Sequence, residues 1–159
     1  MGYSITIGEL EIETHDDDGL DCTGLSFDAV GVSRDEAPAF GEPTDYTNSR
    51  WPSYTSWSNC LRDAGIYDLF FDNGHLIGGH PGVRLVTKEF VEEFKKRKQV
   101  FEQKYPNVQP TYGENHKGVF GEVDEDNPEE NSVYCRVVWL DYWLTWALEN
   151  CKVPVIANH

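Results

Sequence analysis

The stretch SVYCRVVWLDYWLTWALENC, residues 132–151, decides how this chain folds. Its side chains are apolar on nearly every side of a helix, and such a helix is stable only when other elements surround it. The sequence therefore predicts a central core helix that begins at Ser132. Its polar exceptions recur every four residues and share one face: Asp141, Thr145 and Glu149. That stripe either faces a pocket, where a carboxylate meets an arginine or a ligand, or it faces solvent.

Two further helices are predicted upstream. Residues 87–105, TKEFVEEFKKRKQVFEQKY, place four aromatic rings on one side, and acidic residues precede basic ones, which complements the helix dipole. Thr87 is the predicted N-cap. A shorter helix is predicted to start at Pro52, which suits a first turn, and to end at Gly65.

The N-terminal part predicts strands. Residues 3–14 alternate between apolar and polar on both sides of Gly8, which indicates one bulged strand or a tight hairpin. Residues 25–32 alternate again, residues 66–71 favour a short strand or turn, and Asn73-Gly74 favours a hairpin turn. The tail after residue 152 predicts a short strand or an extended end.

Strands precede helices without a β-α-β rhythm, which is typical of the α+β class. We expect a single domain over residues 1–159, with N-terminal antiparallel strands packed on about three helices and the last helix central.

The charge of the chain is its strongest global property. The net charge is −15, of which residues 1–50 carry −10 and residues 106–131 carry −6. Such a field repels nucleic acid, so direct nucleic-acid binding is not expected, whereas a basic partner protein or imitation of DNA is allowed. No apolar run is long enough to span a membrane and no signal peptide is visible, so a cytoplasmic location with reduced cysteines is expected.

The segment TNSRWPSYTSW, residues 47–57, is the first candidate site. Its aromatic rings are spaced by three residues, and an arginine stands at the positive end of the predicted helix. Such a surface can bind an anion while a ring stacks on a planar group. The alternative interpretation is a packed corner, with Trp57 in the core and Arg50 paired with an acidic residue. The candidate ligand-binding residues are Asn48, Arg50, Trp51, Tyr54 and Trp57.

The segment HLIGGHPGVR, residues 75–84, is the second candidate site, because its glycines let the backbone approach a ligand closely. His80 and Arg84 are its candidate ligand-binding residues, together with Asp141 and Thr145 of the last helix. The alternative is an ordinary surface turn. The acidic runs lack the spacing of calcium loops, and the familiar hydrolase and nucleotide-loop motifs are missing. No metal, cofactor or catalytic residue is predicted, and a binding protein is favoured over an enzyme.

Four segments carry a resemblance: EPTDYTNSRWPSYTSW, GIYDLFFDNG, HPG and DYWLTWALENCKVPVIANH. They are similar to a family of small uncharacterised bacterial, phage and prophage proteins. The resemblance implies a phage context, in which proteins of this kind often inhibit host defences, and it carries no catalytic residues.

The sequence thus predicts a non-enzymatic binding protein of phage type that sequesters a small planar anionic, nucleotide-derived ligand, with a role against host defence. Its pocket would join residues 48–57, residues 75–84 and the last helix. The alternatives are an acidic DNA mimic that blocks a basic host protein, and a small hydrolase. A homo-oligomer is compatible with the sequence.

Overall fold

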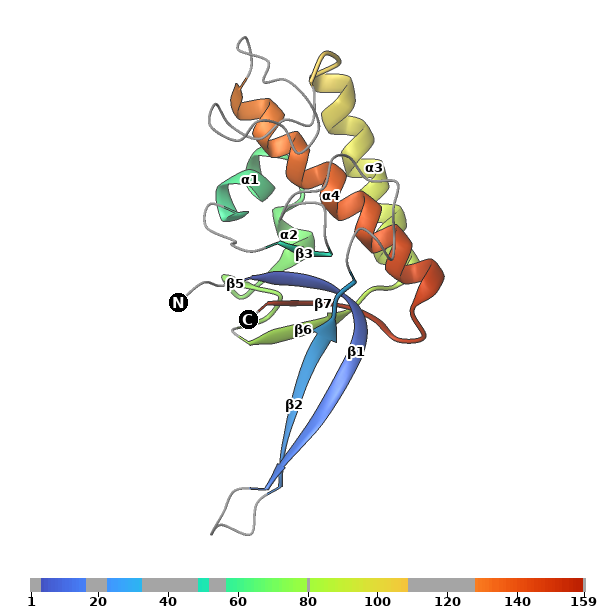
Figure 1. Cartoon of the computed structure of the whole chain (residues 1–159). Helices are drawn as coiled ribbons and strands as arrows, with labels where there is room; N and C mark the ends of the chain where they lie inside the picture. Colours follow the sequence, from blue (N-terminus) through green and yellow to red (C-terminus); the bar gives the residue numbers. More distant parts are fainter. Residues whose placement is uncertain are drawn as a thin grey trace.

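In the described part of the chain, a main antiparallel sheet packs against a layer of helices, which confirms the predicted α+β class (Figure 1). The computed structural model describes residues 4–16, 23–32, 49–51, 57–79, 81–108 and 128–158. Its helices are α1 (Trp57–Asp63), α2 (Tyr67–Phe70), α3 (Lys88–Lys104) and α4 (Pro128–Asn150). Its strands are β1 (Ile5–Asp16), β2 (Thr23–Val30), β3 (Arg50–Trp51), β4 (Phe71–Asp72), β5 (His75–Leu76), β6 (Gly82–Leu85) and β7 (Pro154–Asn158).

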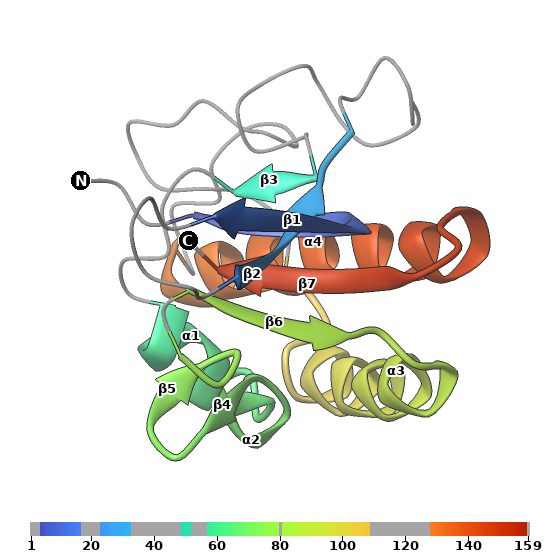
Figure 2. The same cartoon turned by 90° about the horizontal axis from the view of Figure 1, so that it is seen from below.

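The sheet has the strand order β2-β1-β7-β6, and β3 pairs with β1. The C-terminal β7 is therefore an inner strand, hydrogen-bonded between β1 and β6. In Figure 2 β1 and β7 lie in front of α4, which covers one face of the sheet. β4 and β5 form a separate two-stranded hairpin.

The helix α4 is the centre of the core, as its composition predicts. Trp139, Leu140, Trp143 and Leu144 have no exposed surface. They belong to one cluster of buried side chains that includes Ile7 of β1 and Ile156 of β7. Because α4 contacts α1, α3, β1 and β7, it holds the helix layer and the sheet together.

Strand β1 differs from the prediction of a bulge or hairpin at Gly8. It runs without interruption from Ile5 to Asp16, and its register with β7 and then with β2 contains no inserted residue. Ile5 and Ile7 are buried in the main core, whereas Leu10 packs in a second small cluster around Ala29 and Val155. The apolar residues of β1 therefore shift from odd-numbered to even-numbered positions, because the strand first contributes to the core on one face of the sheet and then to the cluster on the other face.

Several local predictions are confirmed. Thr87 caps α3, with its hydroxyl accepting a hydrogen bond from the N–H of Phe90 at 3.1 Å. Asn73 and Gly74 form the turn between β4 and β5, both with positive φ, 49° and 79°. The C-terminal tail forms a strand.

Other boundaries differ from the prediction or lie outside the described residues. Trp51 lies in β3, where it pairs with Ile5 across the sheet. The described helix α1 begins at Trp57, and the predicted start at Pro52 lies outside the described residues. Residues 67–70 form a helical turn, which agrees with the turn alternative predicted for residues 66–71. α4 starts at Pro128, before the predicted Ser132. The short strand β6 was not predicted, since its four residues carry too weak a pattern on their own.

Candidate functional site

The tryptophans of the first candidate site lie in the core. Trp51 and Trp57 are each 1% exposed, and together with Trp139 they form a cluster of edge-to-face contacts with ring centroids 5.4, 5.5 and 5.9 Å apart. This is the packing geometry that aromatic rings prefer. A planar ligand would reach these rings only if the core opened, so both residues fit the packed-corner interpretation.

A buried arginine completes this cluster. The guanidinium of Arg136 lies 5.4 Å from the ring centroid of Trp51 and 5.8 Å from that of Trp57. It also donates to the carbonyl and hydroxyl oxygens of Ser132, one turn earlier in α4, at 3.1 and 3.0 Å. The sequence prediction assigned the cation of this region to Arg50; in the structure Arg136 is the cation beside these rings.

The predicted pocket does not bring Arg50 and Arg84 together. Arg50 pairs with Thr6 in β1, and Arg84 pairs with Ile156 in β7. Since β1 and β7 lie between β3 and β6, the two arginines are about 14 Å apart by strand spacing. They also occupy opposite faces of the sheet. Ile156 pairs with Ile7, the residue after Thr6, and successive residues of a strand point to opposite faces. Arg50 therefore shares the face of Thr6, and Arg84 shares the face of Ile156. Asn48, Tyr54 and His80 lie outside the described residues.

The polar stripe of α4 serves packing between helices. The carboxylate of Asp141 forms ion pairs with the ammonium groups of Lys95 and Lys98 on α3, at N–O distances of 2.8 and 3.1 Å. Thr145 has a buried hydroxyl without a hydrogen-bond partner, and Glu149 is exposed. Asp141 therefore joins two helices, and the stripe ends in solvent.

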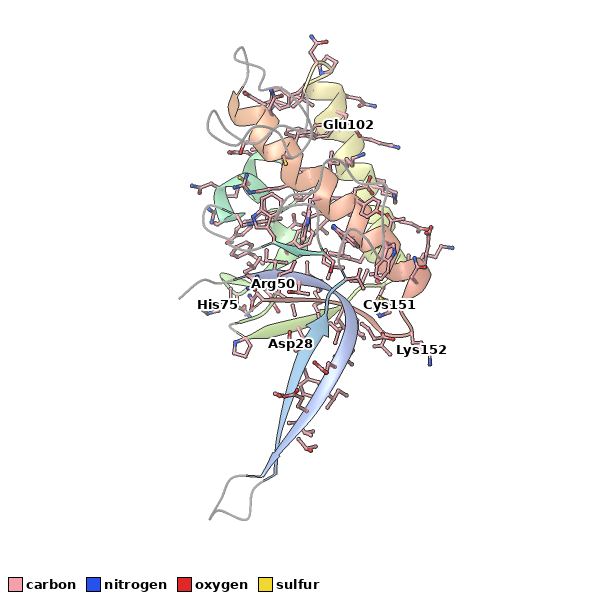
Figure 3. The ribbon with its side chains drawn as sticks, viewed as in Figure 1. Asp28, Arg50, His75, Glu102, Cys151 and Lys152 are labelled. Atoms are coloured by element: carbon pink, nitrogen blue, oxygen red, sulfur yellow. The ribbon has the colours of Figure 1, made fainter. Side chains whose placement is uncertain are left out.

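The face of the sheet away from α4 carries an apolar groove. We call it the hairpin groove, because one wall comes from the β1–β2 hairpin that projects from the sheet (Figures 1 and 3). It encloses about 490 Å³. Its lining residues come from four strands and the loop before β6: Leu10, Leu25, Ser26, Phe27, Pro81, Val83, Leu85 and Val155. Leu25 is 58% exposed, Phe27 47% and Leu85 57%, so the groove is an open apolar surface.

The opposite face of the same hairpin is acidic. The register pairs Glu11 with Asp28 and Ile12 with Phe27, so carboxylates and apolar side chains occupy opposite faces. Glu9 also fixes the base of the hairpin, because its carboxylate accepts the backbone N–H groups of Lys152 and Val153 at 3.1 and 2.6 Å. Asp28 lies on the projecting strand in Figure 3.

Sequence reasoning missed this groove, although the signal was present. The apolar and acidic residues of both strands alternate with period two, and strands of this kind were predicted. The alternation does not show which face of the sheet the apolar side occupies. Only the sheet topology shows that α4 covers the other face.

A second, more polar cleft lies beside β6. This loop cleft encloses about 450 Å³, and its lining residues are Asp68, Phe71, Asp72, Ile77, Gly78, Val83 and Arg84. Ile77 has a φ of 54°, which a β-branched residue adopts only under strain. Buried Asn158 holds the loop in place, since it donates to the Leu76 carbonyl and accepts the N–H of Gly82 at 2.8 Å.

The charges of the loop cleft are partly engaged. Arg97 binds Asp68 through two nitrogens and holds the pKa of that carboxyl below its usual value. Arg84 donates to the Leu69 carbonyl, and its guanidinium lies 5.3 Å from the ring centroid of Phe90. Arg84 and the aromatic residue Phe71 both line this cleft.

The described cysteines carry no sign of nucleophilic chemistry. Cys60, Cys135 and Cys151 are free thiols, and burial raises the pKa of each, that of Cys135 to about 12. A raised pKa keeps a thiol protonated and unreactive near neutral pH. No cluster of potential metal ligands occurs among the described residues.

Searches of protein-family models, curated proteins and solved structures found no match to this chain. The resemblance to phage and prophage proteins therefore stays a prediction. Within the described ranges, no helix has the length and apolar character to cross a membrane. The fold and its surfaces define an acidic α+β protein with a helix layer on one face of the sheet and an open apolar groove on the other.

Proposed function

We propose that this chain is a non-enzymatic binding protein that takes a basic, apolar-bearing segment of another polypeptide into the hairpin groove. The observation that carries the proposal is the two-faced hairpin: exposed apolar side chains on one face and carboxylates on the other. This corresponds to the acidic inhibitor predicted as an alternative from the sequence, with the contact now assigned to particular residues.

Charge selects the kind of partner. The net charge of −15 is concentrated toward the N-terminal part, where the hairpin lies. A field of this sign accelerates encounter with a basic surface and opposes association of two copies of the chain. The apolar groove then supplies the contact area, since exposed apolar patches commonly mark interaction sites.

The proposal predicts selective binding of cationic apolar peptides. A fluorescently labelled peptide of valine and lysine should bind, and replacing lysine by glutamate or valine by serine should weaken binding about tenfold or more. Affinity should also fall as salt is raised, because salt screens the charges. Fluorescence polarisation at several salt concentrations measures both effects.

A pair of variants tests whether the groove is the binding site. Phe27→Asp should weaken binding about tenfold, since burying half a phenylalanine ring contributes roughly 1–1.5 kcal/mol. Because the substitution adds negative charge, a loss of affinity for the basic peptide cannot be caused by weaker electrostatic attraction. Val100→Asp is the matched control, because Val100 is 65% exposed on α3, away from the groove. Equal effects of the two substitutions, or no effect of Phe27→Asp, would reject the groove.

A small anionic ligand in the loop cleft is the second candidate function. Arg84, the ring of Phe71 and the strained backbone at Ile77 support it, and this is the remaining form of the proposed nucleotide-derived ligand. The carboxylates of Asp68 and Asp72 in the same cleft oppose an anion.

Two arginine variants decide between the candidate anion sites. If a nucleotide binds in the loop cleft, Arg84→Ala should weaken binding about tenfold or more, because a charge-assisted contact is worth roughly 1.5–3 kcal/mol. Arg50→Ala, on the other face of the sheet, should leave binding unchanged. Thermal-shift titration with mono-, di- and cyclic nucleotides measures this, since a ligand of the folded state raises the melting temperature. If only Arg50→Ala weakens nucleotide binding, the site lies at the 48–57 segment instead. If no nucleotide raises the melting temperature, this candidate function is rejected.

A further inference from the structure

We propose that the partner segment binds as an additional β-strand on the outer edge of β2. This inference rests on the proposed function and specifies how the hairpin groove is filled. It also predicts the sequence pattern of the partner.

The outer edge of β2 presents main-chain hydrogen-bonding groups. Leu10 donates its N–H to the carbonyl of Val153, at 2.9 Å, on the side of β1 away from β2. Leu10 and its partner Ala29 are therefore a non-hydrogen-bonded pair, and the main-chain groups of Ala29 point to the outer edge. By the same alternation those of Phe27 and Leu25 do so too. The N–H of Ala29 already donates to the carboxylate of Asp28 at 2.7 Å, so an added strand would pair mainly with Phe27 and Leu25.

The two edges of the sheet differ in how they are protected. Proteins usually blunt an edge strand with proline, lysine, short length or a covering element. β6 has only four residues and follows Pro81. β2 has eight residues and contains no proline or lysine. Among the strands that the structure describes, β2 pairs with β1 alone.

A strand added to this edge would sort its side chains onto the two faces of the hairpin. Successive side chains of a strand point to opposite faces. Every second side chain of the partner would then join Leu25 and Phe27 on the groove face. The others would lie on the face of Glu11, Glu13 and Asp28. The edge therefore fits an extended segment that alternates apolar and basic residues, which is the β-augmentation mode of peptide recognition.

A second copy of the chain is the less suitable occupant. Pairing two β2 edges would place the acidic faces of two hairpins side by side, between molecules that each carry a net charge of −15. A basic segment instead brings opposite charges together across the new strand pair.

The test compares peptides of the same composition. A peptide with strictly alternating valine and lysine should bind at least tenfold more tightly than one with valines at helical spacing. Two further versions carry backbone N-methyl groups, one at the valines and one at the lysines. Only one version should lose affinity, about tenfold or more, because alternate N–H groups of an added strand face β2 and the others face solvent. Loss at valine indicates an antiparallel strand, and loss at lysine a parallel one.

The outcomes separate this inference from the proposed function. If the helical peptide binds as tightly as the alternating one, or if both methylated versions bind unchanged, the added strand is wrong while the function stands. If no cationic apolar peptide binds, the function itself fails. Dimers of the unliganded protein that Phe27→Asp disrupts, measured by sedimentation, would overturn the choice of a basic partner.

Two substitutions at one position test the edge from the protein side. Phe27→Ala removes the ring, whereas Phe27→Pro removes the ring and the outward N–H. Proline is tolerated at an edge when its nitrogen faces outward, so both variants should fold. Phe27→Pro should bind the alternating peptide about tenfold more weakly than Phe27→Ala if the peptide pairs antiparallel. Equal affinities of the two variants, after a valine-methylated peptide has shown a loss, would overturn the added strand.

Discussion

Replacing Trp143 by alanine should lower the free energy of unfolding by about 3–5 kcal/mol, the usual cost of removing a large buried aromatic ring. Trp143 has no exposed surface and lies in the middle of α4, in edge contact with Tyr142 and Trp146 at centroid distances of 4.9 and 5.6 Å. The core cannot close over the space, because α4 is held by elements on several sides. Denaturant unfolding followed by circular dichroism measures the change.

Trp146→Ala is the matched control, because it removes the same ring from the same helix at a position that is only half-buried. It should cost about 1–2 kcal/mol, within the usual range for single substitutions. Equal losses for the two variants would mean that α4 is not the centre of the core. A loss below about 1 kcal/mol for Trp143→Ala would place this helix at the periphery.

Replacing Gly8 by alanine should cost about 3 kcal/mol, the upper end of the usual range for overpacking. An added Cβ atom at Gly8 would lie 1.9 Å from the carbonyl oxygen of Val30, a backbone atom that no rotamer change can move. The end of β2 must therefore shift. Because β2 forms a wall of the hairpin groove, the substitution should also weaken peptide binding.

Gly65→Ala separates this steric effect from the general cost of losing a glycine. Gly65 has a φ of 73°, and nothing lies within 4 Å of an added Cβ atom. Alanine there should cost about 1–2 kcal/mol from backbone strain alone and leave the groove unchanged. Thermal and denaturant unfolding of both variants, with peptide titration, measure the two effects. If the Gly8→Ala variant is as stable as the Gly65→Ala variant, the carbonyl of Val30 does not lie as close to Gly8 as the structure places it.

The groove and the edge of β2 belong to one element with two tasks. The first part of β1 packs against α4 through Ile5 and Ile7, and the second part forms the projecting hairpin with β2. The rigid core thus holds the outer edge of β2 in place before a partner binds, and such preorganisation lowers the entropy cost of binding. The fixation of the hairpin base by Glu9 supports the same interpretation.

The candidate sites show where sequence reasoning stops. An arginine and tryptophans close together in the chain indicated a ligand site at residues 48–57. In the structure Trp51 and Trp57 are buried in the core and contact Arg136 of α4. Proximity along the chain does not determine which face of the sheet a side chain occupies. The prediction also joined Arg50 and Arg84 in one pocket. The strand order separates them, and the register of the strands places them on opposite faces.

The sequence by itself determined the elements whose signal is local and strong. The apolar surround of α4, the cap and aromatic side of α3, the Asn73–Gly74 turn and the alternation of β1 and β2 follow from side-chain chemistry within a few turns or strand repeats. Only the tertiary structure decided that β7 enters the sheet between β1 and β6, because pairing of distant strands depends on contacts that no short window contains. That pairing decides which face α4 covers. It therefore also decides that the apolar side of the β1–β2 hairpin remains open as a groove.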